Sequence, residues 1–115
     1  MPTLEQITAR IREFRDERDW MQFDNPKDMA IAISLEASEL LAHFLWKDSR
    51  ASFKRAEERI SGVREEIADV AIYLFEMADI LGIDLLEAVE DKLRLNAEKY
   101  PVAKAKGRSD KYSEI

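Results

Sequence analysis

Four acidic residues lie in apolar stretches of the sequence, where charged side chains are unusual. Glu36 and Glu39 are the only acids in residues 29–46, and Glu66 and Asp69 repeat their spacing in a second apolar stretch. Residues three apart share one face of a helix, and an isolated carboxylate among Ile, Leu and Val is unfavourable to desolvate. If the two stretches pack together, the four carboxylates repel one another and require a positive charge. Other glutamates, in more polar surroundings, are expected to be ordinary surface acids.

The ligand types available to such a cluster favour a hard cation. The chain has no cysteine and a single histidine, His43, so a site needs oxygen ligands, which suit Mg²⁺ or Mn²⁺ better than zinc. Di-iron bundle proteins use Glu-x-x-His, whereas Glu39 and His43 are four apart and occur once. We expect His43 to be a partly buried residue and not a ligand. Magnesium on carboxylates usually shares its ion with substrate phosphates, which indicates a phosphorylated small molecule.

Composition limits the class of protein. With 115 residues the chain is expected to form one domain over 1–115, with a helical core to about residue 100 and a tail over 101–115. A net charge of −6 argues against a broad polynucleotide-binding surface. The charged N-terminus is unlike a secretory signal, and no uncharged stretch reaches the length of a membrane span, so the cytoplasm is the expected location.

The periodicity is helical nearly throughout, so the predicted fold class is all-α. Thr3 and Gln6 predict a capping box, Asn25 and Pro26 predict a second helix start, and Gly82 predicts a helix stop. The glycine of Ser61-Gly62 predicts a kink or division in the third helical region. Four helical regions are expected: residues 4–18, 26–46 or 47, 51–81, and 85 to just before 101.

The spacing of the acids resembles that of a known family. Glu36-x-x-Glu39, 26 intervening residues and then Glu66-x-x-Asp69 is similar to the ExxE…ExxD signature of the MazG-like all-α nucleoside triphosphate pyrophosphohydrolases. Further segments resemble the dCTP pyrophosphatase branch, and together with the signature they cover nearly the whole chain. These segments are ERDW at 17–20, QF at 22–23, FLWK at 44–47, EEIADVAIYL at 65–74, Asn96, Tyr100-Pro101 and KYSEI at 111–115.

The resemblance implies a magnesium-dependent enzyme, with manganese as a substitute, that cleaves a nucleoside triphosphate to the monophosphate and pyrophosphate. It implies that the four acids bind the metal and act in catalysis, and that one of the glutamates orients or deprotonates the attacking water. It assigns Trp20 and Trp46 to a base pocket. Tyr73 and Asn96 would hold the sugar or triphosphate, and Lys111 and Tyr112 match the family's ending. Residues 99–111 carry a net charge of +4, which would allow them to contact the negatively charged triphosphate.

Two departures bear on the substrate. The family's dCTP-specific members carry histidine at the positions of Ile11 and Asp24. This leaves dCTP or a modified dCTP as the first expectation and a related NTP or dUTP hydrolase of different or broad specificity as the alternative. A non-catalytic helical oligomerisation module is the third reading. Because the helices are apolar over more than one face, and because the family forms dimers or dimers of dimers, a homodimer or homotetramer is expected.

Overall fold

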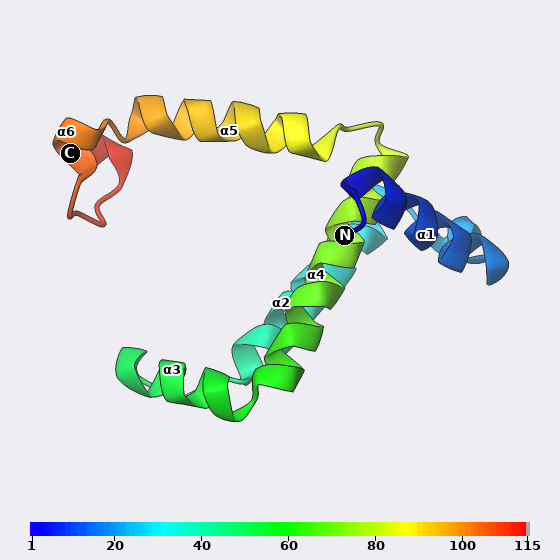
Figure 1. The fold of residues 1–115 in the computed structure, drawn as a ribbon, viewed down its shortest axis with the longest axis horizontal. Helices are drawn as coiled ribbons and strands as arrows, with labels where there is room; N and C mark the ends of the chain where they lie inside the picture. The colour runs from blue at the N-terminus through cyan, green and yellow to red at the C-terminus, as the bar shows by residue number, and fades with distance from the viewer. Residues whose placement is uncertain (115) are drawn as a thin grey trace. The chain divides into compact units, whose positions relative to one another are not determined.

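The computed structural model describes residues 1–114, except for the side chain of Tyr112. These residues form helices and no strand, which confirms the predicted all-α class (Figure 1). They divide into two compact units, residues 1–82 and 83–115. The helices of the first unit are α1 (Leu4–Glu17), η1 (Trp20–Phe23), α2 (Pro26–Ala42), α3 (Ser49–Glu58) and α4 (Ile60–Ile80). Those of the second are α5 (Leu85–Lys99), α6 (Val102–Ala105) and η2 (Tyr112–Glu114).

The start of α1 follows from its capping residues. The Thr3 hydroxyl accepts a hydrogen bond from the Gln6 backbone N–H at 3.1 Å, and the Gln6 side chain accepts one from the Thr3 N–H at 2.9 Å. This reciprocal capping box satisfies two backbone donors that a helix start otherwise leaves without partners. After α1 the chain turns at Asp19, whose φ of 55° lies in the left-handed region. The turn leads directly into η1.

The helices α2 and α4 lie side by side and run in opposite directions, and they form the main packing unit (Figure 1). Asn25 caps α2 by accepting a hydrogen bond from the Asp28 N–H at 2.9 Å, with Pro26 at the first helical position. The buried apolar residues of the described chain are Met29 on α2 and Val63 and Ala78 on α4. α1 packs against α4. The two acid-bearing stretches are therefore neighbours, as the site prediction requires.

Two helix boundaries differ from the sequence prediction. The helix α2 ends at Ala42 and not at 46 or 47, because the following residues form a turn in which Trp46 takes a φ of 64°. The third helical region divides into α3 and α4 at Arg59, whose φ of −120° and ψ of 29° interrupt the helix. The division therefore falls two residues before Ser61-Gly62. Asp48 fixes the start of α3 by accepting a hydrogen bond from the Ala51 N–H at 2.8 Å.

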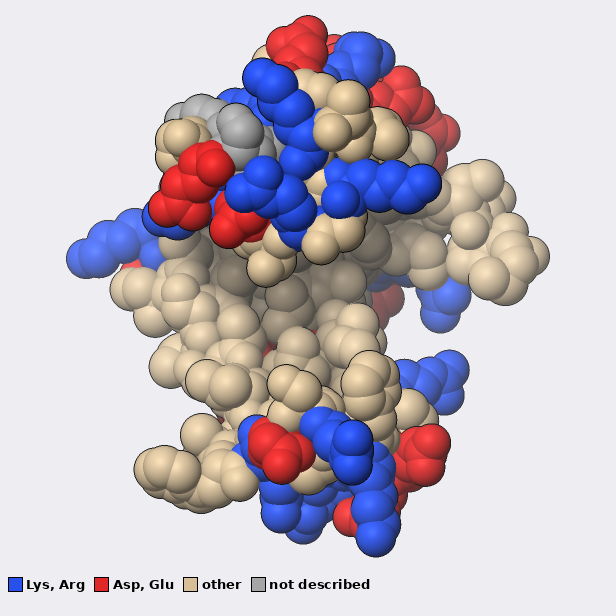
Figure 2. All heavy atoms as spheres, turned by 90° about the vertical axis from the view of Figure 1, so that its left-hand side faces the viewer, with Lys and Arg blue, Asp and Glu red and all other residues tan. Residues whose placement is uncertain are grey.

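The short helix α3 carries charged side chains on its surface. Its basic residues Arg50, Lys54 and Arg55 outnumber the acids Glu57 and Glu58. Figure 2 shows charged side chains of this region gathered at the bottom of the view. The Arg55 Nε also donates a hydrogen bond of 2.9 Å to the His43 carbonyl oxygen, which ties α3 to the end of α2.

In the second unit, Asp84 caps α5 by accepting a hydrogen bond from the Glu87 N–H at 3.1 Å. Gly82 precedes this start with a φ of 67°, a conformation that favours glycine, and it confirms the predicted helix stop. The predicted tail over 101–115 contains the short helix α6 and the turn η2. Within residues 1–114, none of the helices combines the length and apolar character needed to cross a membrane.

Candidate active site

Three of the four predicted acids converge where α2 packs against α4. One carboxylate oxygen from each of Glu36, Glu39 and Glu66 can be chosen so that all lie within 4.8 Å of one another. We call these three residues the acid cluster. The Oε2 atoms of Glu36 and Glu66 are buried, and neither has a hydrogen-bond partner among the described residues. The helix pair thus holds acceptors that nothing in the described chain satisfies.

The electrostatics of the cluster reflect this crowding. Desolvation raises the pKa of Glu36, and the negative charges of Glu39 and Asp69 raise it further. Desolvation also raises the pKa of Glu66, together with its interactions with Glu39 and Asp69, while His43 lowers it. Asp69 therefore contributes to the field of the cluster, although it is not among the three converging groups. Without a cation, the carboxyls of Glu36 and Glu66 hold their protons to higher pH than ordinary glutamates.

A divalent cation fits these residues. The unsatisfied buried oxygens of Glu36 and Glu66, with Glu39 beside them, form an all-oxygen donor set on two rigid helices. Hard cations such as Mg²⁺ prefer oxygen ligands, and Mg²⁺ keeps several waters when few carboxylates hold it. The half-buried Asp69 lies one turn after Glu66 on α4, where it can extend the set.

A cavity of about 650 Å³ lies beside the acid cluster, between α1, η1 and α4. Asp69, whose charge raises the pKa of both Glu36 and Glu66, belongs to its wall. Its polar and charged lining is Arg10, Arg15, Asp24, Asp69, Tyr73 and Glu76. Its apolar and aromatic lining is Ile7, Ile11, Phe14, Trp20, Phe23 and Ile72. We call it the aromatic cavity, and its volume falls in the range of small-molecule sites.

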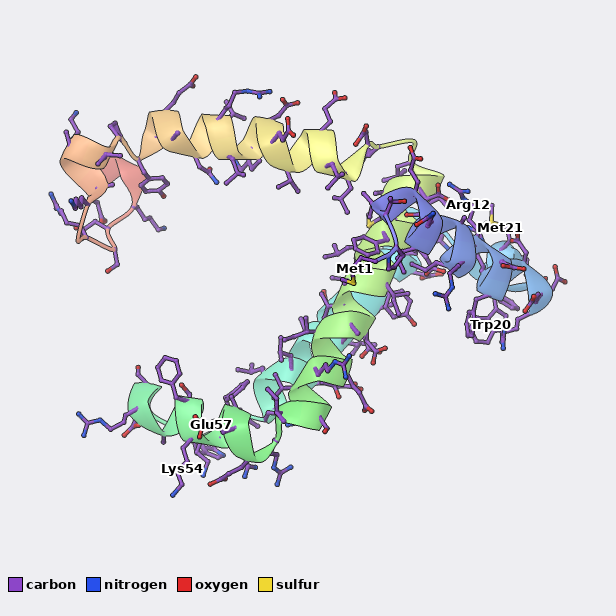
Figure 3. The ribbon with its side chains drawn as sticks, in the orientation of Figure 1. Met1, Arg12, Trp20, Met21, Lys54 and Glu57 are labelled. Atoms are coloured by element: carbon purple, nitrogen blue, oxygen red, sulfur yellow. The ribbon has the colours of Figure 1, made fainter. Side chains whose placement is uncertain are left out.

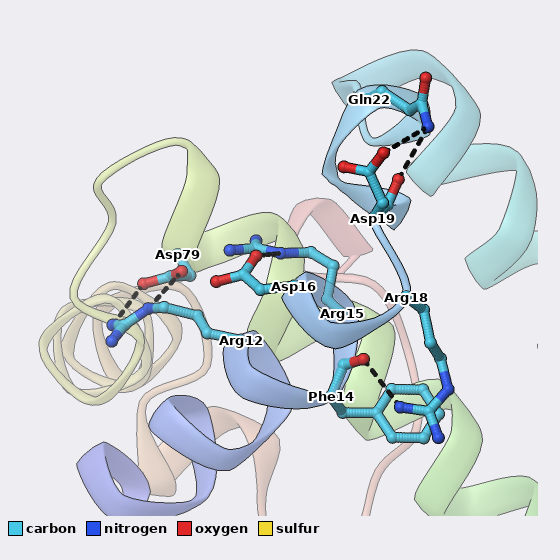
Figure 4. A network of polar contacts seen from close by, with 8 residues as sticks. All are labelled: Arg12, Phe14, Arg15, Asp16, Arg18, Asp19, Gln22 and Asp79. Atoms are coloured by element: carbon cyan, nitrogen blue, oxygen red, sulfur yellow. Dashed lines mark hydrogen bonds and ion pairs between the residues drawn. The ribbon is translucent and has the colours of Figure 1, made fainter.

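Hydrogen bonds between and within helices hold the walls of this cavity (Figure 4). Arg12 on α1 makes a bidentate ion pair with Asp79 on α4, with N–O distances of 2.8 and 2.7 Å. This interaction lowers the pKa of Asp79, mainly through the hydrogen bonds that Arg12 donates. Gln22 donates to both the carbonyl and a carboxylate oxygen of Asp19, which stabilises the turn into η1. The Arg12–Asp79 ion pair therefore fixes α1 against α4, the helix that carries Asp69.

Trp20, the first residue of η1, is labelled in Figure 3 and contributes an aromatic wall to the cavity. Its ring meets Phe14 edge to face at a centroid distance of 5.7 Å, and the Arg18 guanidinium lies 3.7 Å from the Phe14 ring centroid. Trp20 is 48% exposed, so a face of the indole is accessible for stacking. Tyr73 also lines the cavity, and its pKa is raised by burial and then by the charge of Glu36.

The structure does not bring every predicted binding residue to this cavity. Trp46 is 98% exposed in the turn after α2 and is not part of the cavity wall. Asn96 is half-buried on α5 and Lys111 is exposed, both in the second unit. The side chain of Tyr112 lies outside the described residues. The substrate roles of these four residues stay predictions.

Arg15 is one of the cavity residues that the sequence did not single out as a binding residue. Its side chain is 5% exposed, lines the cavity, and donates from Nε to Asp16 at a distance of 3.2 Å. A signal was present in the sequence, because Arg15 follows Ile11 by four residues and so continues the apolar face of α1. A charged residue on the buried face of an amphipathic helix often has a partner or a ligand.

Known proteins similar to this chain share its helical architecture. A pyrophosphatase from Archaeoglobus fulgidus, solved by crystallography, superposes with a TM-score of 0.84 at 42% identity, covering 88% of this chain and 94% of that one. The mouse protein named dCTP pyrophosphatase 1 is 38% identical over 117 aligned positions, which cover 99% of this chain and 68% of the mouse protein. The human protein of the same name has the same identity and coverage.

The family assignment follows from these similarities. A sequence model of the MazG-like family matches residues 31–115, which include all four predicted acids. Because these relatives are enzymes that cover nearly the whole chain, they remove the alternative of a non-catalytic oligomerisation module. The chain belongs to the MazG-like family.

Proposed function

We propose that this protein cleaves a deoxynucleoside triphosphate between the α and β phosphates, at a divalent metal site formed by Glu36, Glu39, Glu66 and Asp69. The class of enzyme follows from its relatives: the chain is a nucleoside triphosphate pyrophosphatase. The observation that carries the proposed site is the convergence of three glutamate carboxylates, with buried unsatisfied oxygens, beside an aromatic cavity. The reaction consumes one water and yields the monophosphate and pyrophosphate.

In the proposed mechanism, the acid cluster and Asp69 hold Mg²⁺ on the rigid pair α2 and α4. A magnesium ion held there would neutralise charge on the triphosphate and would make water more acidic. One glutamate of the cluster orients the attacking water and accepts its proton. Cleavage of this kind depends mainly on positioning and on compensation of charge, which a preorganised carboxylate cluster provides. Without a cation, the same carboxylates would repel the substrate phosphates.

The aromatic cavity is the proposed base site. Trp20 offers an accessible indole face for stacking, and Tyr73 lies in the same wall as Asp69, between base and phosphates. We propose that Trp46, Asn96 and the basic 99–111 segment, with Lys111 and Tyr112, complete substrate binding in a homodimer or homotetramer. Stacking alone accepts any base, so selectivity needs a polar contact in addition.

dCTP, or a dCTP modified on the base, is the first proposed substrate because the mouse and human relatives are named for it. The alternative is a hydrolase of dUTP or of broad specificity. The test incubates the eight common nucleoside triphosphates with the protein and Mg²⁺ and identifies products by anion-exchange chromatography. Monophosphate with pyrophosphate is expected, and chelation of the metal should abolish both. Diphosphate with phosphate, or no turnover of any nucleotide, would contradict the proposal.

A further inference from the structure

The aromatic cavity contains a carboxylate that the proposed chemistry does not use. Asp24 follows η1 and lines the cavity, and its Oδ2 is buried without a hydrogen-bond partner among residues 1–114. Its position is well defined, because its backbone N–H donates to the Met21 carbonyl at 3.2 Å and the next residue, Asn25, caps α2. The acceptor is therefore held in place by two helical elements and left unsatisfied.

Asp24 shares its surroundings with two other charged groups, Glu76 and Arg15. Desolvation raises the pKa of Glu76, the charge of Asp24 raises it further, and the charge of Arg15 lowers it. All three residues line the cavity. The buried guanidinium of Arg15 thus places a positive charge near the two acids. Even so, no donor among the described residues makes a hydrogen bond to Asp24 Oδ2.

Pyrimidine bases differ in the group that they carry at ring position 4. An ionised carboxylate only accepts hydrogen bonds, and its two oxygens exchange by rotation about the Cβ–Cγ bond. Cytosine carries an exocyclic amino group that donates, and aspartate or glutamate is a suitable acceptor for it. Uracil and thymine carry a carbonyl oxygen at the same ring position, which would place two acceptors against each other. A buried acceptor without a partner is unfavourable by an amount that can decide specificity.

On the basis of the function proposed above, we propose that Asp24 sets the base preference by accepting a hydrogen bond from the exocyclic amino group of the base. The aromatic walls hold the ring, while Asp24 distinguishes amino-bearing from carbonyl-bearing pyrimidines. The enzyme is then selective for the cytosine class. This selectivity resides in one side chain at the end of the cavity and is separate from the acid cluster.

The test compares kcat/KM for dCTP, dUTP and a pyrimidin-2-one deoxynucleoside triphosphate, which lacks the 4-amino group. The wild-type enzyme should favour dCTP over both by about 10- to 100-fold, the range of one good contact to a base. Asp24→Asn, whose amide can donate to a carbonyl as well as accept from an amino group, should bring dCTP and dUTP within about threefold of each other. Glu13→Gln is the matched control, since it also replaces a carboxylate by its amide, and Glu13 is exposed on α1 and lies outside the cavity wall. This control should keep the wild-type ranking.

A second readout does not depend on turnover or on folding of the variant. Calorimetry with the wild-type protein should give tighter binding of dCMP than of dUMP. Equal binding, a wild-type preference for dUTP, or an Asp24→Asn variant with unchanged ranking would overturn the assignment to Asp24. These results differ from failure of the proposed function, in which the wild-type protein releases pyrophosphate from no nucleotide.

Discussion

At the scale of single residues, the molecule places three glutamate side chains where charge repulsion should keep them apart. Two of them, Glu36 and Glu66, have buried oxygens without partners among the described residues, and burial raises the pKa of both. Such an arrangement is unfavourable unless protons or a cation compensate the charge. A divalent cation would bind the buried oxygens that lack partners, and it would also reduce the repulsion among the three carboxylates.

The variant Glu36→Gln tests this compensation directly. It keeps the shape of the side chain and removes one charged ligand, so Mg²⁺ affinity measured by calorimetry should fall by at least about 10-fold. Glu65→Gln is the matched control, because Glu65 is exposed and lies next to Glu66 without belonging to the cluster. Equal Mg²⁺ affinity in both variants would show that Glu36 is not a ligand.

The acid pairs could be predicted from the sequence because their surroundings are apolar and their spacing is helical. The cavity could be predicted only in part. Trp20 and Tyr73 line it, but Trp46 was expected in the base pocket and is exposed in a turn of this chain. Periodicity does not fix where a side chain beyond the end of a helix will lie. Arg15 was missed because an arginine on a helix suggests solvent.

At the scale of elements, the close packing of α2 against α4 depends on a small residue. A Cβ added to Gly62 on α4 would lie 2.9 Å from Cε1 of His43, the residue that ends α2. Glycine in a helix is otherwise unfavourable relative to alanine by about 1 kcal/mol. The absent side chain thus gives space to an imidazole that also influences the pKa of Glu66.

Gly62→Ala should lower the free energy of unfolding by about 1–3 kcal/mol despite its better helix propensity, because it overpacks this contact. In a His43→Ala background the same change should be neutral or stabilising. The double-mutant cycle, measured by denaturant unfolding, isolates the contact. If Gly62→Ala stabilises the protein equally in the wild-type and His43→Ala backgrounds, His43 does not restrict the side chain at position 62.

The ion pair between α1 and α4 predicts a pH dependence. Arg12 lowers the pKa of Asp79 below its ordinary value of 3.8, so the folded state binds this proton less readily than the unfolded state. The resulting stabilisation is present above pH 3.8 and is lost as the pH falls through the lower, folded pKa. Asp79→Asn should therefore melt at a lower temperature than the wild-type protein at pH 7, and the difference should close as the pH falls below 3.8 through the folded pKa. A difference in melting temperature that persists in acid would contradict a stabilising role for the Arg12–Asp79 ion pair.

The element boundaries were predictable where capping chemistry is local. Thr3 with Gln6, Asn25 with Pro26 and Asp84 after Gly82 each mark a helix start or stop that the structure confirms. The division at Arg59 was placed two residues late, at Ser61-Gly62. The sequence prediction treated Gly62 as the residue that interrupts the helix, whereas in the structure Gly62 leaves room for the His43 side chain. Such tertiary roles cannot be deduced from propensity.

At the scale of the whole molecule, the apolar content exceeds what one copy buries. The sequence is 46% hydrophobic, yet the buried apolar residues of the described chain are Met29, Val63 and Ala78. Large apolar residues recur at heptad spacing on an exposed face of α4, and α2 exposes others. Those on α4 are Ile60, Ile67, Leu74 and Leu81, and those on α2 include Ile31, Leu35 and Leu41. Exposed apolar faces of this extent favour association.

Light scattering at micromolar concentration should accordingly give a dimer or tetramer for the full chain. Leu74→Asp introduces a charge in the middle of the α4 stripe and should shift the protein toward monomer and lower its melting temperature. A wild-type monomer would contradict the prediction that this face is covered by a second copy. The apolar faces predict that copies of the chain associate, but no local sequence pattern predicts how the copies are arranged.

The central claim is that converging carboxylates, loaded with magnesium, cleave a nucleoside triphosphate. The most direct measurement follows pyrophosphate release from dCTP with Mg²⁺ for the wild-type protein, Glu66→Gln and the neighbouring control Glu65→Gln. Loss of one metal ligand should reduce kcat/KM by about 100-fold or more, since each 1.36 kcal/mol of lost transition-state stabilisation is tenfold. We predict this loss in Glu66→Gln and a rate within about twofold of wild type in Glu65→Gln. Equal rates in all three proteins, or pyrophosphate release that continues after the metal is chelated, would contradict the claim.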